Sequence, residues 1–225
     1  MTDLAKQLKE GTKESHSAAE NTKFVASFLR GVISNENYGL LVANFYYVYR
    51  AMEEEINKLE DHPVVSKLRI PGLGRKQALA ADCEYFYGEN WSDHITPSEA
   101  CQQYVNRIRD IAATQPELLV AHAYTRYMGD LSGGQILKGI AEKALGLVDG
   151  GLDFYEFPAI PDTKAFKVEY RATLDGLDLD QHQINAIITE ANYAFRLNMY
   201  MFEELEGSAV KALLKTLCAM VKGKG

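Results

Sequence analysis

The chain has 225 residues, with 24 Lys and Arg against 31 Asp and Glu, so its formal net charge is −7 at pH 7. This acidic balance argues against a nucleic-acid-binding protein or one that docks on anionic membranes, because both need an excess of basic residues. Hydrophobic residues make up 47% of the chain, which excludes a largely disordered protein and favours a single domain with one core.

Helices are predicted along almost the whole chain, because apolar residues repeat at helical spacing and Pro and Gly mark the breaks. In chain order, we expect one helix from Leu4 through Ala19 and a short one over 24–29 that stops at Gly31. Further helices are expected from 35 to just before Pro63, over 75–87, from 97 through 111, and over 116–146, 162–174 and 180–205. No strand pair or internal repeat is apparent. The pattern predicts an all-α domain.

The chain start and the cysteines indicate a reducing, cytosol-like compartment. Residues 1–6 lack the apolar core of a signal peptide, and no stretch approaches the roughly 18 apolar residues of a membrane span. The three cysteines form no close pair and no metal-binding spacing. We therefore expect a cytoplasmic protein without a membrane anchor, a plastid stroma being the alternative compartment.

The first candidate site lies on the N-terminal helix. Lys9, Thr12, His16 and Glu20 follow one another at steps of three, four and four residues and so share one helical face. The carboxylate of Glu20 can accept a hydrogen bond from one ring nitrogen of His16 and leave the other for a metal. An exposed histidine in a weak helical ion pair explains the same spacing.

The second candidate site is a helical stretch interrupted by Gly129, Gly133 and Gly134, each of which costs about 0.5–1 kcal/mol relative to alanine. Gly129 and Gly133 are four residues apart, so a flat ligand can approach the backbone there, and the turn can bend. Close helix–helix packing explains the same glycines. Asp130 is either a surface residue or part of a polar network within a cavity.

The third candidate site is the pair Lys167 and Arg171, again four residues apart. Two cations on one helical face can clamp the carboxylates of a ligand, although an ordinary solvated face has the same spacing. Phe195 and Asn198 on the last helix do not by themselves favour any one function. The ExxH pairs of di-iron bundles are absent, which disfavours a di-metal oxidase.

Over about residues 3–206 the chain resembles the haem oxygenases, specifically their soluble class. The resemblance rests on residues 8–16 with Glu20, on the run Tyr49-Arg-Ala-Met-Glu-Glu-Glu, and above all on 116–138, which contains Gly-Asp-Leu-Ser-Gly-Gly. It implies an all-α, single-domain fold in which haem lies between a proximal helix and a glycine-kinked distal helix. The implied division is a haem oxygenase domain over 1–206 and a C-terminal helical tail over 207–225.

The resemblance also implies roles for individual residues. His16 would be the axial iron ligand and Glu20 its hydrogen-bond partner. On the distal helix, the backbone of Gly129 and Gly133 would approach bound oxygen, and Asp130 would organise the waters that deliver protons.

The remaining implied roles concern haem binding. The family clamps the haem propionates at positions that correspond here to Lys9, Tyr124, Lys167 and Arg171. Further residues would line or support the pocket, namely Thr12, Tyr49, Arg126, Phe195 and Asn198.

The implied reaction is oxidative cleavage of haem at its α-meso carbon to biliverdin IXα, ferrous iron and carbon monoxide. Haem b would be both substrate and prosthetic group, O2 the co-substrate and ferredoxin the electron donor of a monomeric enzyme. A non-enzymatic haem carrier or sensor is the alternative, and it would need His16 but neither Asp130 nor the glycine kink.

Overall fold

The structure, a computed structural model, describes residues 2–147 and 149–222, with the side chains of 207–222 left out. The described residues form α-helices and short 3-10 helices and no strand. The α-helices are α1 Leu4–Gly11, α2 Lys13–Glu20, α3 Lys23–Leu29, α4 Asn35–Lys58, α5 Lys76–Tyr87, α6 Glu99–Thr114, α7 Leu119–Leu145, α8 Thr163–Asp175 and α9 Gln181–Lys222. The 3-10 helices are η1 Val65–Leu68, η2 Trp91–Asp93, η3 Pro116–Leu118 and η4 Asp153–Tyr155.

Most helix ends coincide with the signals in the sequence. Gly88 and Gly146 follow α5 and α7 with φ of 84° and 62°, the left-handed region in which glycine has no Cβ penalty. Ser98 caps α6 by accepting a hydrogen bond from the backbone N–H of Cys101, and Asp162 caps α8 in the same manner. The predicted all-α fold is confirmed.

The prediction of one continuous N-terminal helix is wrong, because the helix is interrupted at Thr12. Thr12 has φ −110° and ψ 3°, between the end of α1 and the start of α2. Its hydroxyl donates a hydrogen bond to the carbonyl of Leu8 at 2.7 Å. The same carbonyl also accepts the Thr12 backbone N–H at 3.0 Å. Back-bonding of this kind by threonine bends helices, which gives the physical reason for the break.

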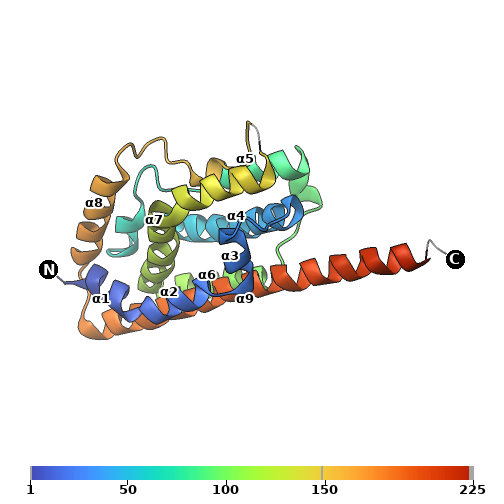
Figure 1. The fold of residues 1–225 in the computed structure, drawn as a ribbon. Coiled ribbons are helices and arrows are strands. Elements are labelled where there is room, and N and C mark those ends of the chain that lie inside the picture. The colour runs from blue at the N-terminus through green and yellow to red at the C-terminus, as the bar shows by residue number, and fades with distance from the viewer. Residues whose placement is uncertain (1, 148, 223–225) are drawn as a thin grey trace.

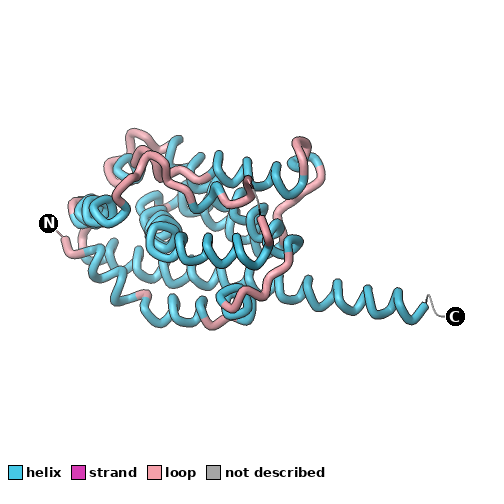
Figure 2. The backbone as a smooth tube through the Cα atoms, turned by 45° about the horizontal axis from the view of Figure 1, so that its top comes forward, coloured by secondary structure: helices cyan, strands magenta, loops and turns pink. Residues whose placement is uncertain are grey.

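Helix α9 is the long element along which much of the molecule is assembled (Figure 1). The helices α1, α2, α3, α4, α6 and α7 all contact it, and α4 also packs on α5 and α6. In the ribbon and in the backbone tube alike, α9 runs well past the other helices toward the C-terminus (Figure 1 and Figure 2). The division at 206/207 stays a prediction, and its last residues, 223–225, lie outside the described part.

Helix α7 changes direction in its middle (Figure 1). Its first half (olive) and its second half (yellow) point in clearly different directions, although hydrogen bonding keeps it one helix over Leu119–Leu145. By residue number, Gly129, Gly133 and Gly134 fall in this middle part. Helices bend where glycines remove side chains and weaken the turn. The predicted glycine-kinked helix is therefore present.

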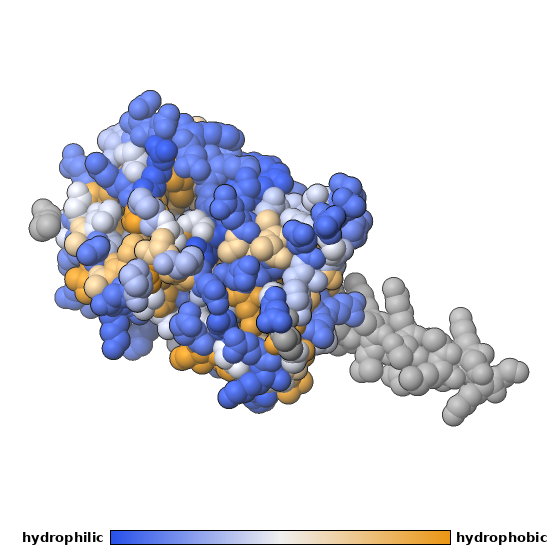
Figure 3. All heavy atoms as spheres, turned by 90° about the horizontal axis from the view of Figure 1, so that it is seen from above, coloured by the Kyte–Doolittle hydropathy of each residue, from blue (hydrophilic) through white to orange (hydrophobic). Residues whose placement is uncertain are grey.

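The surface seen from above is mostly hydrophilic, with bands of hydrophobic residues between polar ones (Figure 3). The large hydrophobic side chains with the greatest exposure are Val32, Ile136 and Val168, at 68%, 65% and 64%. Scattered exposed apolar residues of this kind are normal for a folded protein. Within the described residues, no helix combines the length and the apolar character needed to cross a bilayer.

Candidate active site

The proximal part of the site consists of His16 on α2 and Glu20 one turn later. His16 Nδ1 lies 3.5 Å from Glu20 Oε2, and the two side chains are 55% and 58% exposed. The ring of His16 meets that of Phe195 on α9 edge-on, with centroids 5.7 Å apart. Since Nδ1 faces Glu20, Nε2 is the ring nitrogen left for a metal. The structure thus brings three of the predicted site residues together.

Polar contacts to α9 hold α2 in place. Ser15 Oγ donates to Asn192 Oδ1 at 2.5 Å, and Asn192 Nδ2 donates to the carbonyls of Gly11 and Ile188, both at 2.9 Å. A Cβ at Gly11 would lie 2.6 Å from Ile188 Cγ2. The junction between α1 and α2 therefore sits directly on α9, and this contact sets where His16 is presented.

The single continuous helical face predicted for Lys9, Thr12 and His16 is interrupted at Thr12, where α1 ends and α2 begins. Thr12 is only 4% exposed, and its hydroxyl is occupied by the carbonyl of Leu8. Lys9 is exposed, and no ion-pair partner for it lies among the described residues. Thr12 supports the helix junction, and Lys9 carries a charge available to a ligand.

The glycines of α7 divide into two kinds. At Gly129 and Gly133 no described atom beyond the neighbouring helix backbone lies within 4 Å of the position that a Cβ would take. At Gly134 that position is 3.3 Å from the ring of Tyr155. Close packing against a neighbouring element therefore explains Gly134, whereas Gly129 and Gly133 leave an open stretch of helix backbone.

Asp130 belongs to a buried polar network. Tyr49 donates its hydroxyl hydrogen to Asp130 Oδ2, and Arg126 Nη2 lies 3.7 Å from Oδ1. Arg126 also donates from Nε to the Tyr49 hydroxyl at 3.0 Å and from Nη1 to Asn198 Oδ1 at 2.6 Å. These four residues are at most 9% exposed. The surface alternative for Asp130 is therefore wrong, and Asn198 joins the network through Arg126.

Burial and charge act against each other in this network. Burial raises the pKa of the Asp130 carboxyl, while Arg126 and the Tyr49 hydroxyl lower it, and the net direction is upward. Burial also raises the pKa of the Tyr49 hydroxyl well above its usual range. A carboxyl group of raised pKa, fixed by an arginine and a phenol, is suited to hold or pass a proton.

A cationic group forms where α8 approaches α7. Arg171 donates from Nη1 to the carbonyl of Lys167 at 3.3 Å, which keeps it along its own helix. Arg171 acts on Tyr124 of α7 and opposes the rise in pKa that burial causes there. Helix α1, which carries Lys9, packs on α8. Lys167 and Arg171 have no carboxylate partner among the described residues, so their charges are available to an anionic ligand.

Two sets of site-supporting residues were not predicted from the sequence. The first contains Glu53, whose carboxylate accepts hydrogen bonds from the backbone N–H of Arg75 at 2.6 Å and from the Tyr127 hydroxyl at 3.3 Å. The run Glu53-Glu54-Glu55 suggests a solvated face, and only the first of the three is turned toward α7 in this way. A partly buried carboxylate that accepts backbone N–H groups leaves no local spacing signal.

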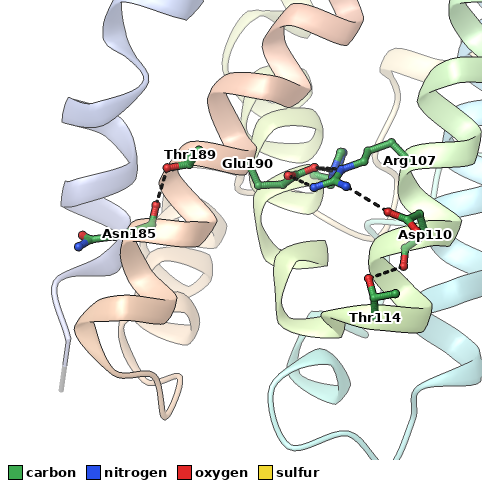
Figure 4. A network of polar contacts seen from close by, with 7 residues as sticks. Arg107, Asp110, Thr114, Asn185, Thr189 and Glu190 are labelled. Atoms are coloured by element: carbon green, nitrogen blue, oxygen red, sulfur yellow. Dashed lines mark hydrogen bonds and ion pairs between the residues drawn. The ribbon is translucent and has the colours of Figure 1, made fainter.

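The second unpredicted set joins α6, α7 and α9 (Figure 4). Arg107 donates to both carboxylate oxygens of Glu190, at 2.9 and 2.7 Å, and Asp110 accepts from the same guanidinium at 3.1 Å. His122 Nε2 lies 2.9 Å from Glu190 Oε1, and the His122 side chain is fully buried. Burial lowers the pKa of His122. This histidine is thus a structural partner of Glu190.

The donor set fits haem on two observations. His16 offers a half-exposed imidazole with one nitrogen held toward a carboxylate, as metal-binding histidines commonly do. The face of α7 at Gly129 and Gly133 is bare, with no described atom within 4 Å of either Cβ position, which suits a flat ring. The unpaired cations Lys9, Lys167 and Arg171 match a ligand that carries carboxylates.

Comparison with known proteins agrees with this chemistry. A family model described as Heme oxygenase matches residues 2–204. Heme oxygenase 1 of Synechocystis sp. PCC 6803 is 56% identical over 211 residues, which cover 94% of this chain and 88% of the relative. Heme oxygenase 1 of Nostoc sp. PCC 7120 is 56% identical over 213 residues, with 94% and 90% coverage.

Among solved structures, the crystal structure of heme oxygenase-1 from Synechocystis sp. PCC6803 in complex with heme superimposes with a TM-score of 0.92. Its sequence identity is 53%, and the match covers 98% of this chain and all of that one. The matched family model spans nearly the whole described fold. The chain therefore belongs to the haem oxygenase family and is an enzyme of that family.

Proposed function

We propose that this enzyme cleaves haem b at the α-meso carbon to biliverdin IXα, ferrous iron and carbon monoxide, with O2 as co-substrate and reduced ferredoxin as electron donor. The observation that carries the proposal is the buried network of Asp130, Tyr49 and Arg126 next to the bare backbone at Gly129 and Gly133. A haem carrier needs an iron ligand and a surface that accommodates the haem ring. Carrying haem does not require a buried carboxyl group of raised pKa beside that surface.

On the proximal side, His16 would bind the iron through Nε2. Glu20 faces Nδ1 at 3.5 Å and keeps the ring oriented, while Phe195 limits its rotation by edge contact. The pair is half-exposed, so its electrostatic pull on the imidazole is weak. The histidine would therefore bind the iron much as the proximal histidine of other haem proteins does.

On the distal side, haem when bound supplies the iron that takes up O2 and the ring that is oxidised. The chain contributes three things there. The bare backbone of Gly129 and Gly133 admits the ligand close to α7. Asp130 holds a proton or an ordered water at its carboxylate, and Tyr49 and Arg126 fix the orientation of that carboxylate.

The cationic group would fix the rotation of the ring. Lys167 and Arg171 on α8, with Lys9 on α1, would bind the two propionates, and the Tyr124 hydroxyl would add a hydrogen bond. Binding both carboxylates at one edge decides which meso carbon faces Asp130, so it decides the product isomer. Thr12 and Asn198 support these groups from the helix junction and from the Arg126 side.

The electron donor would dock by charge. Ferredoxins are mostly acidic and the chain itself carries a net charge of −7, so a local basic patch is required. Lys13, Lys23 and Arg171 are exposed and Lys167 is half-buried, and we propose these four residues as the patch. Rising salt should slow electron transfer from ferredoxin, and a rate independent of salt would contradict the patch.

The experiment that tests the proposed function is turnover. Haemin is added to the purified protein, the visible spectrum is recorded, and ferredoxin, its reductase and NADPH are then supplied in air. We expect the Soret band to decay as a biliverdin band grows, with biliverdin IXα as the only isomer on chromatography. A Soret band that persists unchanged would leave a haem carrier or sensor and overturn the proposal.

A further inference from the structure

Asp82 of α5 is a buried carboxylate that holds a distant loop. It is 0% exposed, and it accepts hydrogen bonds from the backbone N–H groups of Asp153 and Phe154, both at 2.8 Å, 71 and 72 residues further along the chain. These two N–H groups lie in η4. A buried carboxylate is retained only with such partners, because its desolvation is costly.

Arg75 fixes the carbonyl side of the same segment. Its guanidinium, 4% exposed, donates to the carbonyls of Phe154, at 3.4 Å, and of Glu156. It also lies over the ring of Phe157, 3.9 Å from the centroid. Two buried side chains of the α5 region therefore hold both the donors and the acceptors of this short backbone segment.

The segment held by Asp82 packs directly on the bend of α7. Gln135 Nε2 donates to the carbonyl of Tyr155 at 2.9 Å, and the Tyr155 ring lies 3.3 Å from the Cβ position of Gly134. Bulk at Gly134, or movement of Tyr155, would therefore push on the middle of α7. The open positions at Gly129 and Gly133 have no such support from a neighbouring element.

The same segment also supports the partner of Asp130. The Phe154 ring packs edge-on against Tyr49 with centroids 5.6 Å apart, and Tyr49 donates its hydroxyl hydrogen to Asp130. Asp82 thus reaches the distal carboxylate by two routes. One runs through Tyr155 and Gln135 to α7, and the other runs through Phe154 and Tyr49 to Asp130.

We propose that Asp82 is a positioning residue for haem cleavage, which sets the bend of α7 and the Tyr49–Asp130 hydrogen bond by clamping the backbone at 153–154. The inference rests on the proposed role of Asp130. Burial raises the pKa of Asp82 to about 6, against the two backbone hydrogen bonds, which agrees with a carboxylate placed for its contacts at some electrostatic cost.

The test compares Asp82→Asn with Asp153→Asn in the full-length, haem-free protein. Asp153→Asn removes an exposed carboxylate from the clamped segment and leaves the clamp intact. In Asp82→Asn an amide NH2 replaces one acceptor. We expect backbone amide exchange at 153 and 154 to accelerate at least about tenfold. We also expect the Asp130 carboxyl pKa, followed by carbon NMR, to rise by about half a unit as the Tyr49 bond weakens. Neither change is expected in Asp153→Asn.

Gln135→Ala gives a second route to the same readout if Asp82→Asn does not fold, because it removes the hydrogen bond to Tyr155 from an exposed position. Gln135→Ala should also raise the Asp130 pKa, but by less than Asp82→Asn does. An unchanged Asp130 pKa in the folded variants would make Asp82 a local loop clamp and overturn the proposal. Since this readout needs no haem, failure of turnover in the parent protein would remain a separate result.

Discussion

The proximal and distal sides of the site are built in opposite ways. His16 and Glu20 are more than half exposed and meet at 3.5 Å within one helix, so their contact with each other requires no residue outside α2. Asp130 is 9% exposed and is held by residues from α4 and α7, which themselves depend on α9. The proximal side depends on contacts within one helix and is exposed, whereas the distal side depends on contacts between distant parts of the chain and is buried.

This difference in burial indicates which property of the protein each side controls. A half-exposed ion pair contributes little to stability, whereas breaking a buried charge network leaves an uncompensated charge in the core. Changes on the proximal side should therefore alter haem chemistry with the fold unaffected. Changes on the distal side should alter both.

The largest contrast is expected between Asp130→Ala and His16→Ala. Asp130→Ala leaves Arg126 buried without its carboxylate and should lower the free energy of unfolding by about 3–5 kcal/mol. His16→Ala should change it by less than about 0.5 kcal/mol. Urea unfolding of the haem-free proteins measures both, with the exposed neighbour Ser132→Ala as control.

Both substitutions should lower turnover by about a hundredfold or more. They differ in the bound spectrum, because only His16→Ala should lose the axial nitrogen signature of haem. Equal destabilisation by the two substitutions would contradict the contrast between a local and a long-range side.

A second large effect concerns Glu190, which ties the first half of α7 to α9. Burial by itself raises the pKa of Glu190, but hydrogen bonds from His122 and Arg107 outweigh it and lower the pKa to about 2. The ionised Glu190 therefore stabilises the folded state fully at pH values above the ordinary glutamate pKa of 4.5. This stabilisation is lost as the pH falls toward 2. Its size is about 3 kcal/mol.

Stability measured across this acid range should fall in the parent protein and depend much less on pH in Glu190→Gln. Asp110→Asn serves as the control, since it alters only the exposed partner of Arg107. An unchanged acid slope in Glu190→Gln would show that this distal-side network carries no such stabilisation.

Gly129→Ala should separate stability from activity. Its Cβ meets open space, so the substitution should stabilise the haem-free protein by about 0.5–1 kcal/mol through helix propensity. The added methyl group would stand where the ligand approaches, and turnover should fall about tenfold. Gly139→Ala, also open at its Cβ position and on the second half of α7, should stabilise without that loss. Destabilisation by Gly129→Ala would contradict the open face.

The smallest effect is expected for Glu20→Gln. The amide keeps the shape of the side chain and removes a charge that solvent already screens at 58% exposure. Unfolding free energy should change by less than about 0.5 kcal/mol, with a modest shift of the iron–histidine vibration in the haem-bound protein. A large change in stability would mean that the proximal side is as strongly coupled to the core as the distal one.

Local features of this molecule could be predicted from the sequence. Helix ends at Gly88 and Gly146 follow from the need for positive φ, and the His16–Glu20 contact follows from four-residue spacing. The break at Thr12 was not predicted, because its cause is a threonine hydroxyl that bonds back to the carbonyl of Leu8 in addition to the backbone N–H. Propensity alone does not reveal which polar side chain will bond to its own backbone.

Long-range partners could not be predicted from spacing. Phe195 lies against His16 across 179 residues of chain, and Glu190 meets His122 across 68. The roles of the α7 glycines could not be predicted either, since the sequence is equally consistent with close helix packing and with the approach of a ligand to the backbone. Only the position of Tyr155 distinguishes Gly134 from Gly129 and Gly133.

A few turns of α9 serve both sides of the site. Asn192 and Phe195 contact the helix that carries His16, and Glu190 and Asn198 hold partners on α7. Each residue added to a helix rotates everything beyond it by about 100°. Over 190–198 a single insertion or deletion would therefore turn the proximal contacts away from the distal ones. Across homologous chains the length of this stretch should therefore stay fixed.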